Sequence, residues 1–202
     1  ASQEKIDPVR FITNHSTGKM GRAIAENCML RGAEVTLVNA SVSVEPPMFV
    51  DVVNVTSAAD MAEVVKAKAS QQDIIIMTAA VADFRPAHPA DEKIKKKDQS
   101  DASVVELERT EDILSYLGAH KTQGQIICGF SMETEHMLEN SKAKLAKKNA
   151  DMIVANNLKV AGAGFGTDTN IVTLITADDC KELEIMDKSR VAEKIMDKLI
   201  EM

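Results

Sequence analysis

The chain has 202 residues, a formal net charge of −7 at neutral pH and a hydrophobic content of 45%. This length and composition predict a single folded domain, residues 1–202, and exclude a disordered chain. The negative charge argues against a surface that binds nucleic acid, and no apolar run is long enough to span a membrane. Because no signal-peptide pattern is present either, we expect a cytoplasmic protein.

Cysteine and histidine spacing gives no metal or disulfide motif. The three cysteines, Cys28, Cys128 and Cys180, are far apart and form no CxxC pair. The four histidines show neither HxH nor HExxH spacing. We therefore expect unpaired thiols and no structural zinc site, and the sequence identifies no metal ligands.

The first predicted elements are a loop and a helix. Residues 1–8 are polar and predict a loop. Apolar residues recur at helical spacing from Gly18 to Arg31 and predict the first helix. If the stretch before it is an ordinary capped turn, Ser16 or Thr17 is the predicted N-cap.

Short apolar strands and amphipathic helices alternate along the next part of the chain. The run Asp73–Ala80 is mostly apolar, as expected of a parallel strand covered on both faces. The predicted strands are residues 35–38, 49–55, 73–80, 126–130 and 151–155, and the later helices are residues 56–70, 110–123, 133–149 and 188–202. This alternation predicts an α/β fold with a doubly wound, Rossmann-like, mostly parallel sheet.

Two hairpins interrupt the alternation. Ser103–Glu108 predicts a strand that pairs with the segment around Ile94 to form a β-hairpin arm, with Asp98–Asp101 as its turn. Asn170–Ile175 and Glu182–Ile185 predict a second hairpin near the C-terminus.

The stretch Asn14–Gly21 is a candidate anion site. Small and hydroxyl residues lead into the first helix, whose initial backbone N–H groups are free to bind an anion. The stretch matches neither the Walker A loop nor the GxGxxG fingerprint. An ordinary capped turn explains it equally well when it is taken alone.

Several polar residues follow the predicted strand ends, where ligands of such folds bind. Lys93–Lys97 is a dense basic cluster that could stabilise charge on a phosphate, although most such clusters are simply solvated. Lys144 and Lys148 share a helix face, which suggests either an anionic partner or an exposed surface. Asp83 could accept from a ribose hydroxyl or cap a turn, and Asn14 could donate to a developing oxyanion or cap a turn.

Taken together and in this order, these motifs resemble the bacterial phosphopantothenoylcysteine synthetase family. Each motif alone is weak, but the ordered set is specific and covers nearly the whole chain from Asp7 onward. The matching stretches are Asp7–Gly21, Ala79–Arg85, Glu92–Lys96, Gly129–Phe130, Lys144–Asn149, Ala155–Asn157 and Phe165–Asn170.

The resemblance implies a ligase of coenzyme A biosynthesis that joins 4′-phosphopantothenate to cysteine. Bacterial members use CTP and Mg²⁺: the carboxylate attacks the α-phosphate to give an acyl-cytidylate and pyrophosphate, and cysteine then displaces CMP. The resemblance also implies a homodimer with the arms at its interface. In many bacteria a decarboxylase domain precedes the ligase domain in one polypeptide, and in others the ligase domain stands alone, so the resemblance leaves a decarboxylase domain or partner open.

The family's site residues carry over position by position. Asn14 matches the residue that acts on the acyl-nucleotide, and Lys93 matches the lysine of the first half-reaction. Nucleotide contacts are implied for Asp83, Lys93, Glu111, Asp112, Ile113, Leu114, Phe130, Lys144 and Lys148, and phosphopantothenate or phosphate contacts for Asn14, Gly18, Ala79 and Ala80.

The sequence departs from the family pattern at two points. Glu111 stands where the family carries proline, and the apolar first strand and Gly-rich turn that usually precede Asp7 are absent. The absent strand keeps a non-catalytic nucleotide-binding module open as an alternative. A Rossmann-type NAD(P) reductase is a second alternative, although the chain lacks GxGxxG and has His120, not lysine, four residues after Tyr116.

Overall fold

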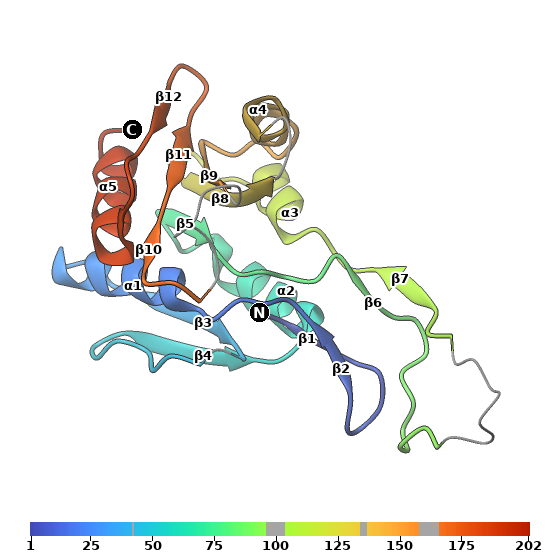
Figure 1. Cartoon of the computed structure of the whole chain (residues 1–202). Helices are drawn as coiled ribbons and strands as arrows, with labels where there is room; N and C mark the ends of the chain where they lie inside the picture. Colours follow the sequence, from blue (N-terminus) through green and yellow to red (C-terminus); the bar gives the residue numbers. More distant parts are fainter. Residues whose placement is uncertain (42, 96–103, 134–136, 158–165) are drawn as a thin grey trace.

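The computed structural model describes residues 1–41, 43–95, 104–133, 137–157 and 166–202 (Figure 1). Its elements in chain order are β1 (Gln3–Lys5), β2 (Phe11–Thr13), α1 (Lys19–Leu30), β3 (Thr36–Ala40), β4 (Asp51–Val55), α2 (Ala58–Ala69), β5 (Ile74–Met77), β6 (Phe84–Pro86), β7 (Leu107–Arg109), α3 (Ile113–Ala119), β8 (Ile126–Glu133), α4 (Met137–Lys147), β9 (Met152–Asn157), β10 (Thr169–Asn170), β11 (Val172–Ile175), β12 (Cys180–Glu182), β13 (Met186–Asp187) and α5 (Lys188–Ile200).

The central sheet has five strands in the order β12-β11-β9-β8-β5. Strands β5, β8 and β9 run parallel, and β11 and β12 extend the sheet in antiparallel fashion. This mixed α/β fold with a mostly parallel sheet confirms the predicted fold class. The C-terminal hairpin is also present, with its second strand beginning at Cys180 rather than Glu182.

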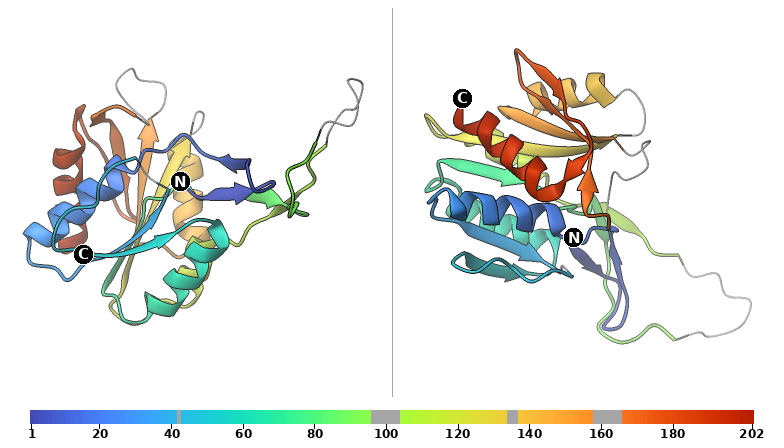
Figure 2. Two further views of the ribbon diagram at one scale, coloured as in Figure 1. Left: turned by 90° about the horizontal axis from the view of Figure 1, so that it is seen from below. Right: turned by 60° about the vertical axis from the view of Figure 1, so that its left-hand side comes forward.

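Alternate residues of the parallel strands enter two separate cores. Met152 and Val154 pack with α1 and α5, whereas Ile153 and Ala155 pack with α2, α3 and α4. All four are completely buried. Figure 2 shows the corresponding layers, with α1 and α5 on one face of the sheet and the other helices on the opposite face. Because side chains alternate along a strand, each parallel strand needs a helical cover on both sides.

The parallel strands are interrupted between β3 and β5. Among the described residues, β3 pairs only with β4, and β5 pairs only with β8. The space between them holds a cavity of about 140 Å³ lined by apolar side chains that include Leu37, Val38, Ile75 and Met77. All four residues of β5 are therefore only half-buried, although the sequence predicted a fully covered strand. The sheet is thus open where a further strand would pair.

Two predictions of local structure are wrong. Part of residues 1–8 is not a loop but strand β1, which pairs antiparallel with β2. The arm comprises β6, β7 and the described residues between them, 87–95 and 104–106. In it, β7 pairs with β6 rather than with the segment around Ile94. The sequence did not predict β6, because Pro86 lies in it and proline disfavours strands. Pro86 is tolerated because β6 pairs with β7 on one side and its other edge is unpaired within the described part of the chain. The predicted turn Asp98–Asp101 lies outside the described residues.

Gly118 sets the distance between α3 and the end of α4. A Cβ atom at Gly118 would lie 1.8 Å from the backbone oxygen of Lys148. The side chain of Asn149 also donates a hydrogen bond to the Gly118 carbonyl at 2.8 Å. The two segments are therefore in direct backbone contact, which a larger residue would prevent.

We expect Gly118→Ala to lower the free energy of unfolding by about 1–3 kcal/mol, because the added methyl group must push the helices apart. Urea unfolding followed by circular dichroism measures this loss. Ala119→Ser, on the exposed face of the same helix, is the control and should change stability by less than about 0.5 kcal/mol. Equal losses in both variants would contradict the close approach.

Candidate active site

A cavity of about 290 Å³ opens at the carboxyl ends of β3, β5 and β8, beside the N-terminus of α1. This is the edge of the sheet at which ligands of doubly wound folds bind. Of the residues that the sequence singled out, Asn14, Gly18, Ala79, Ala80 and Phe130 line it. The structure thus gathers residues from two loops and one strand around a single space, and their roles in binding stay predictions.

Helix α1 begins directly at the cavity. Its N-cap is Gly18, which has φ 83° and makes no side-chain capping bond, so the prediction of Ser16 or Thr17 as N-cap is wrong. The left-handed backbone at Gly18 favours glycine and turns the chain so that the helix starts one residue later. Ser16, Thr17 and Gly18 all line the cavity, which receives the positive end of the helix dipole.

Asn14 joins the loop before α1 to the loop after β5. Its side-chain Nδ2 donates a hydrogen bond to the Ala80 carbonyl at 3.2 Å. The Asn14 side chain is exposed, and both residues line the cavity. An amide N–H group therefore stands at the point where the two predicted substrate loops meet.

Two lysines lie on another wall of the cavity. Lys19 forms an ion pair with Asp168 at 2.7 Å and donates to the Gly166 carbonyl at 3.0 Å. Lys188, the first residue of α5, is only 7% exposed and donates to the Thr167 carbonyl. Burial lowers the pKa of Lys188, the nearby Lys19 lowers it further, and Asp168 acts in the opposite direction. Two ammonium groups and one carboxylate thus lie beside the N-terminus of α1.

Phe130 and Lys144 lie at the β8 side of the cavity. Phe130 is half-buried and lines the cavity, whereas Lys144 lies on α4 behind it. The Lys144 ammonium donates to the Phe130 carbonyl at 2.9 Å. Lys144 therefore contacts the cavity wall rather than its interior.

Lys148 is held by α3. Its ammonium forms an ion pair with Asp112 and donates to the Ser115 hydroxyl at 2.8 Å. Asp112 is the N-cap of α3 and accepts from the Ser115 backbone N–H at 2.9 Å. Burial alone would raise the pKa of Asp112, but the bonds from Lys148 and Ser115 outweigh it and leave the pKa below its usual value. The Lys148 charge thus has a protein partner, so the lysine pair by itself is no evidence of an anionic ligand.

The remaining predicted residues lie away from the cavity. Ile113 and Leu114 have buried side chains that pack in the core formed by α2, α3 and α4, so only their backbone is available to a ligand. Glu111 forms an ion pair with Lys66 of α2. Asp83 and Lys93 are exposed, Asp83 next to β6 and Lys93 farther along the arm. None of these residues lines the cavity.

The sequence analysis assigned no role to three polar residues of the cavity. Lys188, Asn156 and Asn170 are all buried there, and the Asn170 side chain donates to that of Asn156 at 2.7 Å. Asn156 and Asn170 lie in stretches that match the family pattern, whereas the signal at Lys188 was local. A lysine at the first position of a helix opposes the helix dipole, so another interaction must hold it there.

Within the described ranges, no group of three or more histidine, cysteine, aspartate or glutamate residues could hold a metal ion. No helix among the same described residues is long and apolar enough to cross a membrane.

The parallel strands, their helical layers and a cavity at the carboxyl edge of the sheet define a doubly wound α/β domain with its cavity where ligands of such folds bind. The chain belongs to the family described as the DNA/pantothenate metabolism flavoprotein C-terminal domain, whose model matches residues 1–202.

The chain is 48% identical over 200 residues to the coenzyme A biosynthesis bifunctional protein CoaBC of Bacillus subtilis (strain 168), covering 98% of this chain and 48% of that protein. It therefore spans about half the length of the curated relatives it matches.

Solved structures show the same fold. The crystal structure of the C-terminal domain of a coenzyme A biosynthesis bifunctional protein CoaBC matches with TM-score 0.83 and 46% identity, over 100% of this chain and 92% of that one. A Cab2 mutant, described as a complex with phosphopantothenate-cysteine, matches with TM-score 0.79 and 16% identity, over 99% of this chain and 84% of that one.

We expect Asp112→Asn to lower stability by about 1 kcal/mol at pH 7, because it removes a charged helix cap and the partner of Lys148. The folded-state pKa of Asp112 is depressed, so its contribution is present above the unfolded value of about 3.9 and is lost as pH falls through the folded pKa. Urea unfolding at pH 7 and at pH 3 measures both variants. A stability difference that grows at the lower pH would contradict this assignment.

Proposed function

We propose that this chain carries phosphopantothenate–cysteine ligase activity in coenzyme A biosynthesis, with CTP as the activating nucleotide. Family membership and 48% identity to a bifunctional protein of coenzyme A biosynthesis support the proposal. The main structural support is that Asn14, the N-terminus of α1 and the Ala79–Ala80 loop meet at one cavity. A related fold, Cab2, is described in complex with phosphopantothenate-cysteine, which fits the same reaction.

In the first half-reaction the substrate carboxylate attacks the α-phosphate of CTP. A new P–O bond forms, the bond to pyrophosphate breaks, and an acyl-cytidylate results. The N-terminus of α1, Lys19 and Lys188 supply a positive wall for these phosphates. We assign Lys93 the neutralisation of charge on the departing pyrophosphate. Mg²⁺ would bind mainly through the nucleotide phosphates and water.

In the second half-reaction the amine of cysteine attacks the acyl carbonyl, an amide bond forms and CMP leaves with the broken acyl–phosphate bond. The carbonyl oxygen becomes negatively charged as the amine adds. Asn14 can donate to that oxygen, because its present bond to the Ala80 carbonyl is long, at 3.2 Å, and its side chain is exposed. This assigns the two proposed catalytic residues to different steps.

The test is pyrophosphate release from CTP with 4′-phosphopantothenate, followed by amide formation when cysteine is added. We expect Asn14→Asp to slow the second step about 100-fold, so that the acyl-cytidylate accumulates. Lys93→Gln should instead block most pyrophosphate release, slowing it at least about 100-fold to a residual rate that can still be measured. Mass spectrometry of quenched reactions separates the steps. The proposal fails if wild-type protein releases no pyrophosphate with CTP or ATP, and the division of roles fails if both variants lose both steps equally.

We also propose that the chain forms a homodimer through the arm and the β1–β2 hairpin. Several large apolar side chains are exposed there, namely Val9 at 60%, Phe11 at 48%, Phe84 at 45% and Leu107 at 48%. Figure 1 shows the β1–β2 hairpin and the β6–β7 ribbon projecting on the same side of the domain. Grouped exposed side chains of this kind are typical of an association surface.

Lys93 lies on this projecting arm and does not line the cavity of its own chain, so we propose that a second copy supplies the lysine at each site. Equilibrium sedimentation should give a dimer. If Lys93 acts across the interface, a 1:1 refolded mixture of Asn14→Asp and Lys93→Gln chains should regain about one quarter of wild-type ligation, because half the dimers are mixed and one of their two sites is intact. No regained ligation would show that each chain uses its own lysine.

A further inference from the structure

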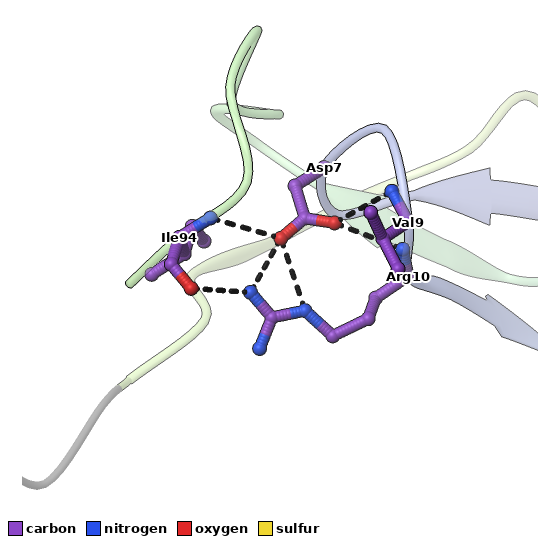
Figure 3. A network of polar contacts seen from close by, with 4 residues as sticks. All are labelled: Asp7, Val9, Arg10 and Ile94. Carbon is purple, nitrogen blue, oxygen red and sulfur yellow. Dashed lines mark hydrogen bonds and ion pairs between the residues drawn. The ribbon is translucent and has the colours of Figure 1, made fainter. Parts of the chain in front are cut away.

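A buried carboxylate ties the arm to the β1–β2 hairpin (Figure 3). We propose that Asp7 is a positioning residue, which fixes the arm at Ile94 and thereby sets the place of Lys93 during the first half-reaction. This inference rests on the proposed ligase function.

The Asp7 carboxylate is completely enclosed and accepts five hydrogen bonds. Its Oδ1 accepts from the backbone N–H groups of Val9 at 2.8 Å and Arg10 at 2.9 Å. Its Oδ2 accepts from Nε of Arg10 at 3.0 Å, from Nη2 of Arg10, and from the Ile94 backbone N–H at 3.1 Å. The Arg10 guanidinium is the main cause that holds the pKa of Asp7 well below its usual range, so the carboxylate stays charged at neutral pH.

Ile94 is held through both of its backbone polar groups. Its N–H group donates to Asp7, and its carbonyl accepts from Nη2 of Arg10 at 3.1 Å. Four residues earlier, the Ala90 backbone N–H donates to the Ile6 carbonyl at 2.9 Å. The arm is thus attached to the hairpin on both sides of Lys93, whose own side chain remains exposed.

This arrangement suits a positioning role better than a purely structural one. Residues 91–95 are all exposed, so the hydrogen bonds that Ile94 donates to Asp7 and accepts from Arg10 add no hydrophobic core. They instead order a solvent-facing segment, which costs conformational entropy. The same hairpin leads through β2 to Asn14, four residues after Arg10 or roughly 13 Å of extended chain. One short element therefore carries Asn14 at its end and anchors the segment of Lys93 at its turn.

The test variant is Asp7→Asn, which keeps the side-chain shape. The asparagine NH₂ group must take the place of one carboxylate oxygen. In place of Oδ1 it faces the backbone N–H groups of Val9 and Arg10, and in place of Oδ2 it faces the Arg10 side chain and the Ile94 N–H, so donor meets donor in both orientations. We expect pyrophosphate release with CTP and 4′-phosphopantothenate to slow at least about tenfold, mainly in kcat, because a misplaced catalytic group can cost up to about 100-fold. Amide formation from prepared phosphopantothenoyl cytidylate and cysteine should be unchanged.

The control is Asp60→Asn, in the capping box of α2. Asp60 also accepts backbone N–H groups, those of Thr56 at 3.2 Å and Ser57 at 2.8 Å, but it lies away from the arm. It should leave the first step unchanged. A second, independent readout is hydrogen exchange: Asp7→Asn should speed exchange of the Ile94 amide while β8 and β9 stay protected.

The double variant Asp7→Asn with Lys93→Gln decides between positioning and a general structural effect. A residue that acts through Lys93 causes no further loss once that lysine is gone. Additive losses, equal slowing of both steps, or wild-type pyrophosphate release in Asp7→Asn would each overturn the inference.

If Asp7→Asn does not fold, Arg10→Gln must show the same selective loss, because it cuts the bond to the Ile94 carbonyl. Absence of pyrophosphate release in the wild type would count against the ligase proposal, whereas unchanged Ile94 exchange would count only against the anchoring role.

Discussion

Burial of the parallel strands on both faces is the constraint on which the rest of this structure depends. Met152 and Ile153 are adjacent in β9 and completely buried, yet they pack against opposite helical layers. A sheet of this kind needs helical crossovers between its strands, and those crossovers bring the carboxyl ends of β3, β5 and β8 to one edge. The cavity and the N-terminus of α1 meet at that edge as a consequence.

The elements outside the sheet connect that edge with the arm. The β1–β2 hairpin has Asp7 at its turn and is followed directly by Asn14, so one short pair of strands contacts both the arm and the cavity. On the opposite wall, Lys188 comes from the last helix and Lys19 from the first. The site is therefore assembled from the first and the last helix. Its wall holds Lys19 and Lys188, although the protein as a whole has a net charge of −7.

The elements that the sequence predicted well are those with a strong local pattern. The helix from Gly18 to Arg31 appears as α1, and the apolar run Asp73–Ala80 contains β5. The predictions failed where pairing between distant segments decides the structure. Strand β1 is too short and polar to be distinguished from a loop, and β6 contains Pro86. Both form because a distant or facing segment offers matching hydrogen-bonding groups.

By itself the sequence determined the alternation of strands and helices, the loops that follow the strand ends and the family resemblance, because hydrophobic periodicity and short motifs are local properties of the chain. Only the tertiary structure decided which charges are available. It paired Lys148 with Asp112, buried Lys188 in the cavity wall and enclosed Asp7 against the arm. Burial and ion pairing depend on neighbours that are far apart in the chain, such as Asp7 and Ile94, and no local pattern encodes them.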